Sequence, residues 1–210
     1  MRHRNGYKLG FTLMEALIAI GIFTIGIEGF SLLFVRSWKL NSYALEMGQS
    51  SQAASQGVRG LVDVLRRTRQ ADDGSYPIRS AGTQDLVFYS DYDKDGTTER
   101  LHIYLNNGQV LMGTTKPSSG VPKIYPSGDQ TIKMLVDHVV NGATPIFYYY
   151  NKDYPGDKVN NPVASPVDVS TIRLVKIFLQ ININPSRDPN GIQTESFVEL
   201  RNLNDYDRLQ

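Results

Sequence analysis

Residues 11–35 read FTLMEALIAIGIFTIGIEGFSLLFV, a run of 25 residues whose charged side chains are Glu15 and Glu28. A bilayer core is spanned by roughly 20 apolar residues in a helix, so this run is long enough to cross a membrane. The chain as a whole has 210 residues and a slightly polar mean hydropathy. An apolar run confined to one end of such a chain predicts a membrane part and a soluble part.

The residues around this run indicate its orientation and its class. Basic residues lie before it and after it: Arg2, Arg4, Lys8, Arg36 and Lys39. This bias favours a cytoplasmic N-terminus. A cleaved secretory signal fits poorly, because its apolar region is about 7–15 residues long and its small residues follow that region, whereas Gly10 precedes this one. A plain signal anchor does not explain Glu15, since an unpaired carboxylate in hydrocarbon costs on the order of 2.5 kcal/mol or more.

The stretch KLG followed by FTLMEALIAIGIF resembles the leader of type IV prepilins: a short basic segment, a glycine, an aromatic residue and a glutamate five residues after the glycine. The resemblance implies that a prepilin peptidase cleaves after Gly10 and removes residues 1–10. It also implies methylation of the new amine of Phe11 and pairing of Glu15 with the N-terminal amine of a neighbouring subunit. Two charges buried together are tolerable where one alone is costly.

The helical pattern continues beyond residue 35 and becomes amphipathic over residues 36–70. Apolar side chains recur at helical spacing, among them Val58, Leu61, Val62 and Leu65. The arginines of the sequence RRTR, at residues 66–69, are expected at or near the last turn, where cations suit the helix dipole. They form either a solvated face or a contact with acidic lipid or a partner.

Residues 71–210 predict a globular β-rich domain, because their apolar residues follow period two. Strand candidates are DLVFYS (85–90), RLHIYL (100–105), QVLMGT (109–114), PIFYYYN (145–151), TIRLVKIFLQINI (171–183) and TESFVELRNL (194–203). The residues NNG at 106–108 predict a hairpin turn. The segment 131–141 fits either helix or strand, and residues 114–128 and 151–170 are expected to be loops. The fold class is therefore α+β, a long N-terminal helix followed by antiparallel strands.

This order of elements is similar to that of pilins, and the later segments resemble minor pilins and pseudopilins of the PilW or J-type group. The resemblance implies a structural subunit at or near the tip of a type IV pilus, a type II secretion pseudopilus or a competence filament. Its implied partners are other pilins, the prepilin peptidase, the inner-membrane assembly platform and membrane lipid. The C-terminal domain would be periplasmic or extracellular. Because Glu15 is present, the subunit is expected to dock below another.

The sequence DYDKDGTTE at residues 91–99 concentrates acidic residues between two strand candidates. Its first six positions match an EF-hand loop, but the twelfth is His102 and strands flank it, so an EF-hand is not expected. It is similar to calcium loops in β-hairpins of integrin-type repeats. That similarity implies Ca²⁺ ligands from four carboxylates and one carbonyl: Asp91, Asp93, Asp95, Glu99 and Thr97. The alternative is a solvated polar turn, since Asp and Gly are ordinary turn residues.

Little in the chain suggests catalysis. Cysteine is absent, and His3, His102 and His138 are scattered, without Ser-His-Asp order, zinc spacing or a phosphate-binding glycine loop. The net charge of +1 and the lack of clustered basic and aromatic residues do not suggest nucleic acid as a partner. A non-enzymatic filament subunit is therefore expected. The alternatives are a displayed binding module, namely an adhesin or DNA-uptake pilin, and a membrane-anchored enzyme.

Overall fold

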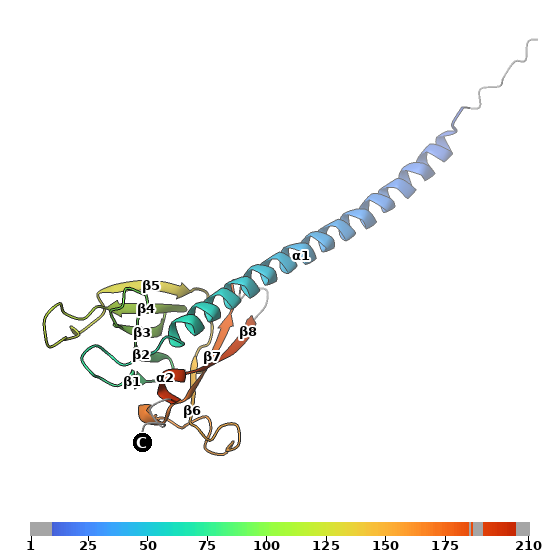
Figure 1. Ribbon diagram of the computed structural model, residues 1–210. Helices are drawn as coiled ribbons and strands as arrows, with labels where there is room; N and C mark the ends of the chain where they lie inside the picture. Colours follow the sequence, from blue (N-terminus) through green and yellow to red (C-terminus); the bar gives the residue numbers. More distant parts are fainter. Residues whose placement is uncertain (1–9, 185, 187–190, 205–210) are drawn as a thin grey trace, which may run out of the picture. The chain divides into compact units, whose positions relative to one another are not determined.

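The structure, a computed structural model, describes residues 10–184, 186 and 191–204, so the remainder of the expected leader, residues 1–9, lies outside the described part. The chain divides after Leu45 into two compact units. Figure 1 labels the α-helices and the strands. In chain order the elements are α1 (Leu13–Leu65), β1 (Ile78–Ala81), β2 (Asp85–Ser90), β3 (Glu99–Asn106), β4 (Gln109–Thr115), β5 (Thr131–Val136), β6 (Phe147–Tyr150), a short 3₁₀ helix (Val169–Thr171), β7 (Leu174–Ile181), β8 (Ile192–Glu199) and α2 (Arg201–Asn204).

The first unit contains the apolar part of α1. Every side chain from residue 10 to residue 41 is exposed, including large apolar ones such as Phe23, Ile25 and Phe30. Among the described residues, α1 is the helix that is long and apolar enough to cross a membrane. An uninterrupted helix satisfies its own backbone hydrogen bonds, which a segment in lipid requires.

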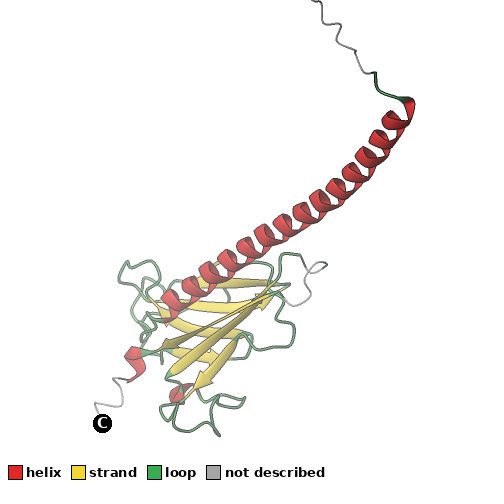
Figure 2. Ribbon diagram, turned by 90° about the vertical axis from the view of Figure 1, so that its right-hand side faces the viewer, coloured by secondary structure: helices red, strands yellow, loops and turns green. Residues whose placement is uncertain are grey.

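The second unit contains two antiparallel sheets. One has the order β1-β2-β3-β4-β5, and the other has the order β6-β7-β8. Figure 2 shows the end of α1 lying along these strands. The predicted fold class, α+β with a long N-terminal helix packed on antiparallel β-sheet, is confirmed.

The hairpin between β3 and β4 turns at Asn107 and Gly108, as the sequence predicts. Both residues have positive φ, 49° and 77°, which a two-residue hairpin turn of type I′ requires. The flanking residues Asn106 and Gln109 pair directly, and the ladder continues to Arg100 and Thr115. This turn therefore sets which residues of β3 and β4 face each other.

The end of α1 enters the core through one stripe of the helix. Its buried residues recur every three or four positions: Ser50, Ala54, Gly57, Val58, Leu61, Val64 and Leu65. The apolar side chains among them, from Ala54 to Leu65, belong to a cluster that also contains Leu86 and Ile103 of the first sheet and Ile177 and Leu179 of the second. Full burial of such a side chain contributes about 1.5–3 kcal/mol. The helix therefore binds both sheets into one core.

The helix ends at Leu65, short of the end near residue 70 that the pattern predicts. The next residues turn away from the helix axis, because Thr68 forms a bridge with Ser90 of β2. The Arg69 N–H then donates to the Tyr89 carbonyl at 2.9 Å. The backbone groups of Thr68 and Arg69 are thus satisfied by the sheet and not by the last helical turn that was expected.

The C-terminal segment differs from the expected strand over residues 194–203. Strand β8 ends at Glu199, and α2 follows. Leu200 and Leu203 are buried in the common cluster. The Asn202 side-chain amide donates to the Thr68 carbonyl at 2.8 Å, so the segment after β8 is tied to the segment after α1.

Candidate functional site

The predicted processing and assembly residues lie at the start of the described chain. Gly10 and Phe11 precede α1 and are exposed. Glu15 lies in the first turn of α1. Its Oε2 atom accepts hydrogen bonds from the Thr12 backbone N–H and the Thr12 hydroxyl, each at 3.0 Å, while the Glu15 N–H donates to Thr12 Oγ1 at 3.3 Å.

This reciprocal pattern is a capping box, in which a Ser or Thr and a Glu three residues later satisfy each other's backbone N–H groups. The T-x-x-E spacing of Thr12 and Glu15 is the sequence signature of this motif, which was missed at the level of the sequence. Glu15 therefore has a local partner within its own subunit as well as the intersubunit partner that the resemblance implies.

The acidic residues 91–99 form the loop between β2 and β3 and the first position of β3. Lys94 and Gly96 have positive φ, 62° and 91°, so the loop turns tightly. Glu99 is completely buried, and its Oε2 atom accepts the Tyr92 N–H at 2.9 Å. Its Oε1 atom is also buried and has no hydrogen-bond partner. Burial raises the pKa of Glu99 above its ordinary value, although the hydrogen bond from Tyr92 opposes this effect.

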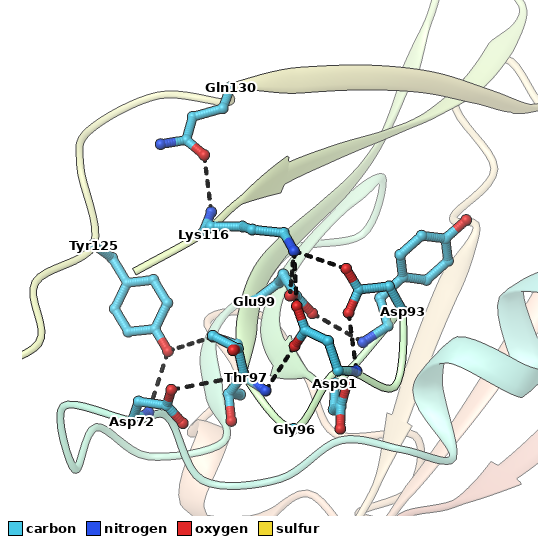
Figure 3. A network of polar contacts seen from close by, with 12 residues as sticks. Asp72, Asp91, Asp93, Gly96, Thr97, Glu99, Lys116, Tyr125 and Gln130 are labelled. Atoms are coloured by element: carbon cyan, nitrogen blue, oxygen red, sulfur yellow. Dashed lines mark hydrogen bonds and ion pairs between the residues drawn. The ribbon is translucent and has the colours of Figure 1, made fainter. Parts of the chain in front are cut away.

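Lys116 places its amine among these carboxylates (Figure 3). Its Nζ atom lies 2.7 Å from Asp93 Oδ2, 3.0 Å from Asp95 Oδ2 and 3.7 Å from Glu99 Oε1. The hydrogen bonds to Asp93 and then Asp95 raise the pKa of Lys116, so this side chain is a stable cation. The chain itself thus supplies part of the positive charge that these carboxylates need.

Arg69 is the second cation of this site, and it comes from the segment after α1. Its guanidinium lies 3.4 Å from Asp91 Oδ2. It also donates to Thr98 Oγ1 and to the Gly96 carbonyl, each at 2.8 Å. The other oxygen of Asp91, Oδ1, is buried without a hydrogen-bond partner. Arg69, expected on or near the last helical turn, instead holds the acidic loop against the segment that follows the helix.

The predicted calcium ligands are only partly brought together. Ligand oxygens of Asp91, Asp93 and Glu99 all lie within 4.8 Å of one another. Asp95 lies beside the same lysine, and its Oδ1 atom accepts the Thr97 N–H at 2.7 Å. This bond, followed by the contact with Lys116, lowers the pKa of Asp95 to about 2. The contact that the structure gives Thr97 in the loop is therefore through its N–H group rather than its carbonyl.

The loop formed by residues 116–130 covers one side of the acidic loop. The Tyr125 hydroxyl donates to the Thr98 carbonyl at 2.6 Å and accepts the Asp72 N–H at 3.1 Å. The Lys116 N–H donates to Gln130 Oε1 at 2.9 Å, which closes the base of this loop (Figure 3). Three segments far apart in the sequence thus meet at the site.

Lys116 was not predicted as part of the site, although the position of the hairpin turn contains the information needed to place it there. Pairing outward from Asn106 and Gln109 places Arg100 opposite Thr115. One step further places Glu99 next to Lys116. The predicted turn therefore fixed a register that brings a lysine beside the buried glutamate.

The two described histidines outside the leader lie in other surroundings. His102 is on β3, and its Nδ1 atom is 3.1 Å from Asp129 Oδ2. The His138 ring lies 3.6 Å from the carboxylate of the neighbouring Asp137. No model of a protein family matches the chain, and no curated protein sequence matches it significantly. The assignment of function therefore depends on the residues of the chain itself.

Proposed function

We propose that this chain is a minor pilin or pseudopilin, a structural subunit that helps to initiate or cap a type IV pilus, a type II secretion pseudopilus or a competence filament. The observation that supports this proposal is the start of α1. An apolar helical surface, exposed throughout, begins just after Gly10 and Phe11 and has Glu15 in its first turn.

An exposed apolar surface of this extent needs lipid or other apolar helices around it. In the bilayer, acyl chains cover it; in a filament, the same segment of neighbouring subunits does so. The partners are thus membrane lipid first and other pilins or pseudopilins afterwards, through the inner-membrane assembly platform.

The orientation follows from the residues around the run. Basic residues precede it at Arg2, Arg4 and Lys8, which favours a cytoplasmic N-terminus and a single pass through the inner membrane. The globular unit is then periplasmic or extracellular. A prepilin peptidase that acts from the cytoplasmic side reaches the bond between Gly10 and Phe11.

Processing tests the proposal directly. We expect that coexpression of the full chain with an active prepilin peptidase yields a mature protein beginning at methylated Phe11, as measured by intact-mass and N-terminal peptide mass spectrometry. Gly10→Val blocks cleavage, because a branched side chain crowds the scissile bond. Gly21→Val, a matched change within the apolar run, leaves cleavage intact.

A known prepilin expressed in the same cells serves as the positive control for the peptidase. If that control is processed while this chain keeps Met1, the proposal is wrong. Cleavage on the far side of Val35 also contradicts it, because the helix would then be a removable secretory signal.

A further inference from the structure

The acidic loop between β2 and β3 combines a buried, incompletely satisfied carboxylate with a lysine that fills the space in front of it. We propose that this loop binds one Ca²⁺ ion, and that the ion displaces the Lys116 amine from between Asp93 and Glu99. The proposal is independent of the filament role, since it concerns a site within the globular unit.

Two buried carboxylate oxygens at this site have no hydrogen-bond partner. Glu99 has a side chain only 1% exposed, and its Oε1 atom lacks a hydrogen-bond partner. The nearest cation, Lys116 Nζ, is 3.7 Å away, beyond the normal range of a hydrogen bond. Asp91 Oδ1 is buried and unsatisfied as well. Buried polar atoms normally have partners, so these two acceptor oxygens of one acidic loop are suited to bind a cation.

The separation of the carboxylate oxygens suits a single bound ion. Oxygens of Asp91, Asp93 and Glu99 lie within 4.8 Å of one another. Calcium binds oxygen ligands at about 2.3–2.6 Å, so two ligands on opposite sides of one ion lie about 4.6–5.2 Å apart. The three carboxylates therefore need little movement to share one ion. Asp95 is outside this group of three and shares the Lys116 amine with Asp93.

The carboxylates at this site outnumber the cations. Four carboxylates, those of Asp91, Asp93, Asp95 and Glu99, face two cations, Arg69 and Lys116. With all groups ionised, two negative charges remain uncompensated. Exchanging the single charge of Lys116 for the double charge of Ca²⁺ lowers this excess from two negative charges to one, and it does so at Glu99, where the lysine does not reach hydrogen-bonding distance.

Lys116 is a suitable group to be displaced. Its side chain is half exposed and follows β4 directly, at the start of the loop of residues 116–130. Its amine can turn into water without disturbing the β3–β4 ladder. An ammonium group has three donors, whereas Ca²⁺ accepts six to eight oxygen ligands and can contact all the carboxylates together. Magnesium is less suited, because it requires a tighter octahedral shell and releases its waters reluctantly.

Calcium titration of the full chain in detergent micelles, after removal of metal by a chelator, tests the proposal by calorimetry. We expect wild type to bind one Ca²⁺ per chain and to melt at a higher temperature in millimolar calcium than in chelator. Asp93→Asn weakens the affinity at least about tenfold. Lys116→Gln strengthens it about tenfold, because the competing cation is gone. Asp153→Asn, in a different loop, serves as the matched control and binds as wild type does.

Absence of calcium binding by wild type at millimolar concentration overturns the proposal. So does equal binding by wild type and Asp93→Asn, which would place the ion elsewhere. If Lys116→Gln binds no more tightly than wild type, the displacement is refuted. Asp93 is 40% exposed, so its substitution does not disturb the core, and far-ultraviolet circular dichroism checks that each variant is folded.

Discussion

A Cβ atom placed on Gly57 of α1 would stand 2.5 Å from a methyl carbon of Val136 on β5. The helix approaches the end of β5 so closely because residue 57 has no side chain. In an exposed helix, glycine is less favourable than alanine by about 1 kcal/mol. Here the close approach reverses that preference, because Val136 is buried and β-branched and has little room to move.

We therefore expect Gly57→Ala to lower the free energy of unfolding by about 1–2 kcal/mol, as overpacking outweighs the gain in helix propensity. Gly60→Ala is the matched control, since nothing lies within 4 Å of a Cβ at that position. It should raise stability by up to about 1 kcal/mol. Denaturant unfolding of the full chain in micelles measures both. Equal stabilisation by the two substitutions would contradict the contact.

The local partner of Glu15, Thr12, and its proposed intersubunit partner can be separated by mutation. Glu15→Ala should leave membrane insertion intact, because it removes a charge from hydrocarbon. It should nevertheless reduce incorporation into isolated filaments, because the neighbour's amine loses its counterion. Thr12→Val removes the hydroxyl of the capping box at a cost of about 0.5–2 kcal/mol, but keeps the carboxylate and should be incorporated.

Glu28→Ala, another carboxylate of the apolar run, is the control for the loss of charge alone. Quantitative immunoblots of sheared filaments compare the variants. If Thr12→Val is excluded as strongly as Glu15→Ala, the role of the glutamate is to start the helix rather than to dock the subunit.

Arg69 should matter more for stability than the other arginines of its cluster. Arg69→Gln breaks the hydrogen bonds to Thr98 and Gly96 and the ion pair with Asp91. We expect a loss of about 1–3 kcal/mol in the free energy of unfolding. Arg66→Gln, at an exposed position, should change it by no more than about 0.5 kcal/mol. If the two substitutions lower the free energy of unfolding by similar amounts, the charge of the cluster stabilises the fold and the contacts of Arg69 do not.

The raised pKa of Tyr125 predicts a loss of stability at alkaline pH. Burial raises the pKa of its hydroxyl to about 12, from an ordinary value of 10. The folded state thus holds this proton where the unfolded state releases it, so the stabilisation is complete below pH 10 and is lost as the pH rises towards 12. Tyr125→Phe should remove that part of the pH dependence and cost about 1 kcal/mol at pH 7. Tyr104→Phe, on β3, serves as the control in the same denaturation series.

The elements with strong periodic patterns could be predicted from the sequence. The long helix, the β3–β4 hairpin with its Asn107 and Gly108 turn, and strands β7 and β8 were all expected. Segment 131–141 remained ambiguous, because β5 is an edge strand whose Ile132 and Met134 are exposed. Its apolar residues therefore do not alternate between core and solvent in the usual way. Strand β1 has only four residues, too few for a periodic signal.

The candidate site could be predicted only where its signal is local. The acidic run was visible because its members are neighbours in the sequence. Lys116 and Arg69 were missed as its cations because they lie on other segments, and only a folded register brings them close. The early end of α1 was hidden for a similar reason. The bridge between Thr68 and Ser90 competes with the helix, and helical periodicity contains no information about it.

The bond from Asn202 to the Thr68 carbonyl joins residues 134 positions apart. Because Leu203 shares a core with Leu61, the globular unit cannot close until residue 203 has been synthesised. Pairings over such long sequence separations form slowly. For that interval the nascent chain is already held by its apolar segment while most of its core is still open. A chain in this state depends on protection from aggregation until α2 has been made.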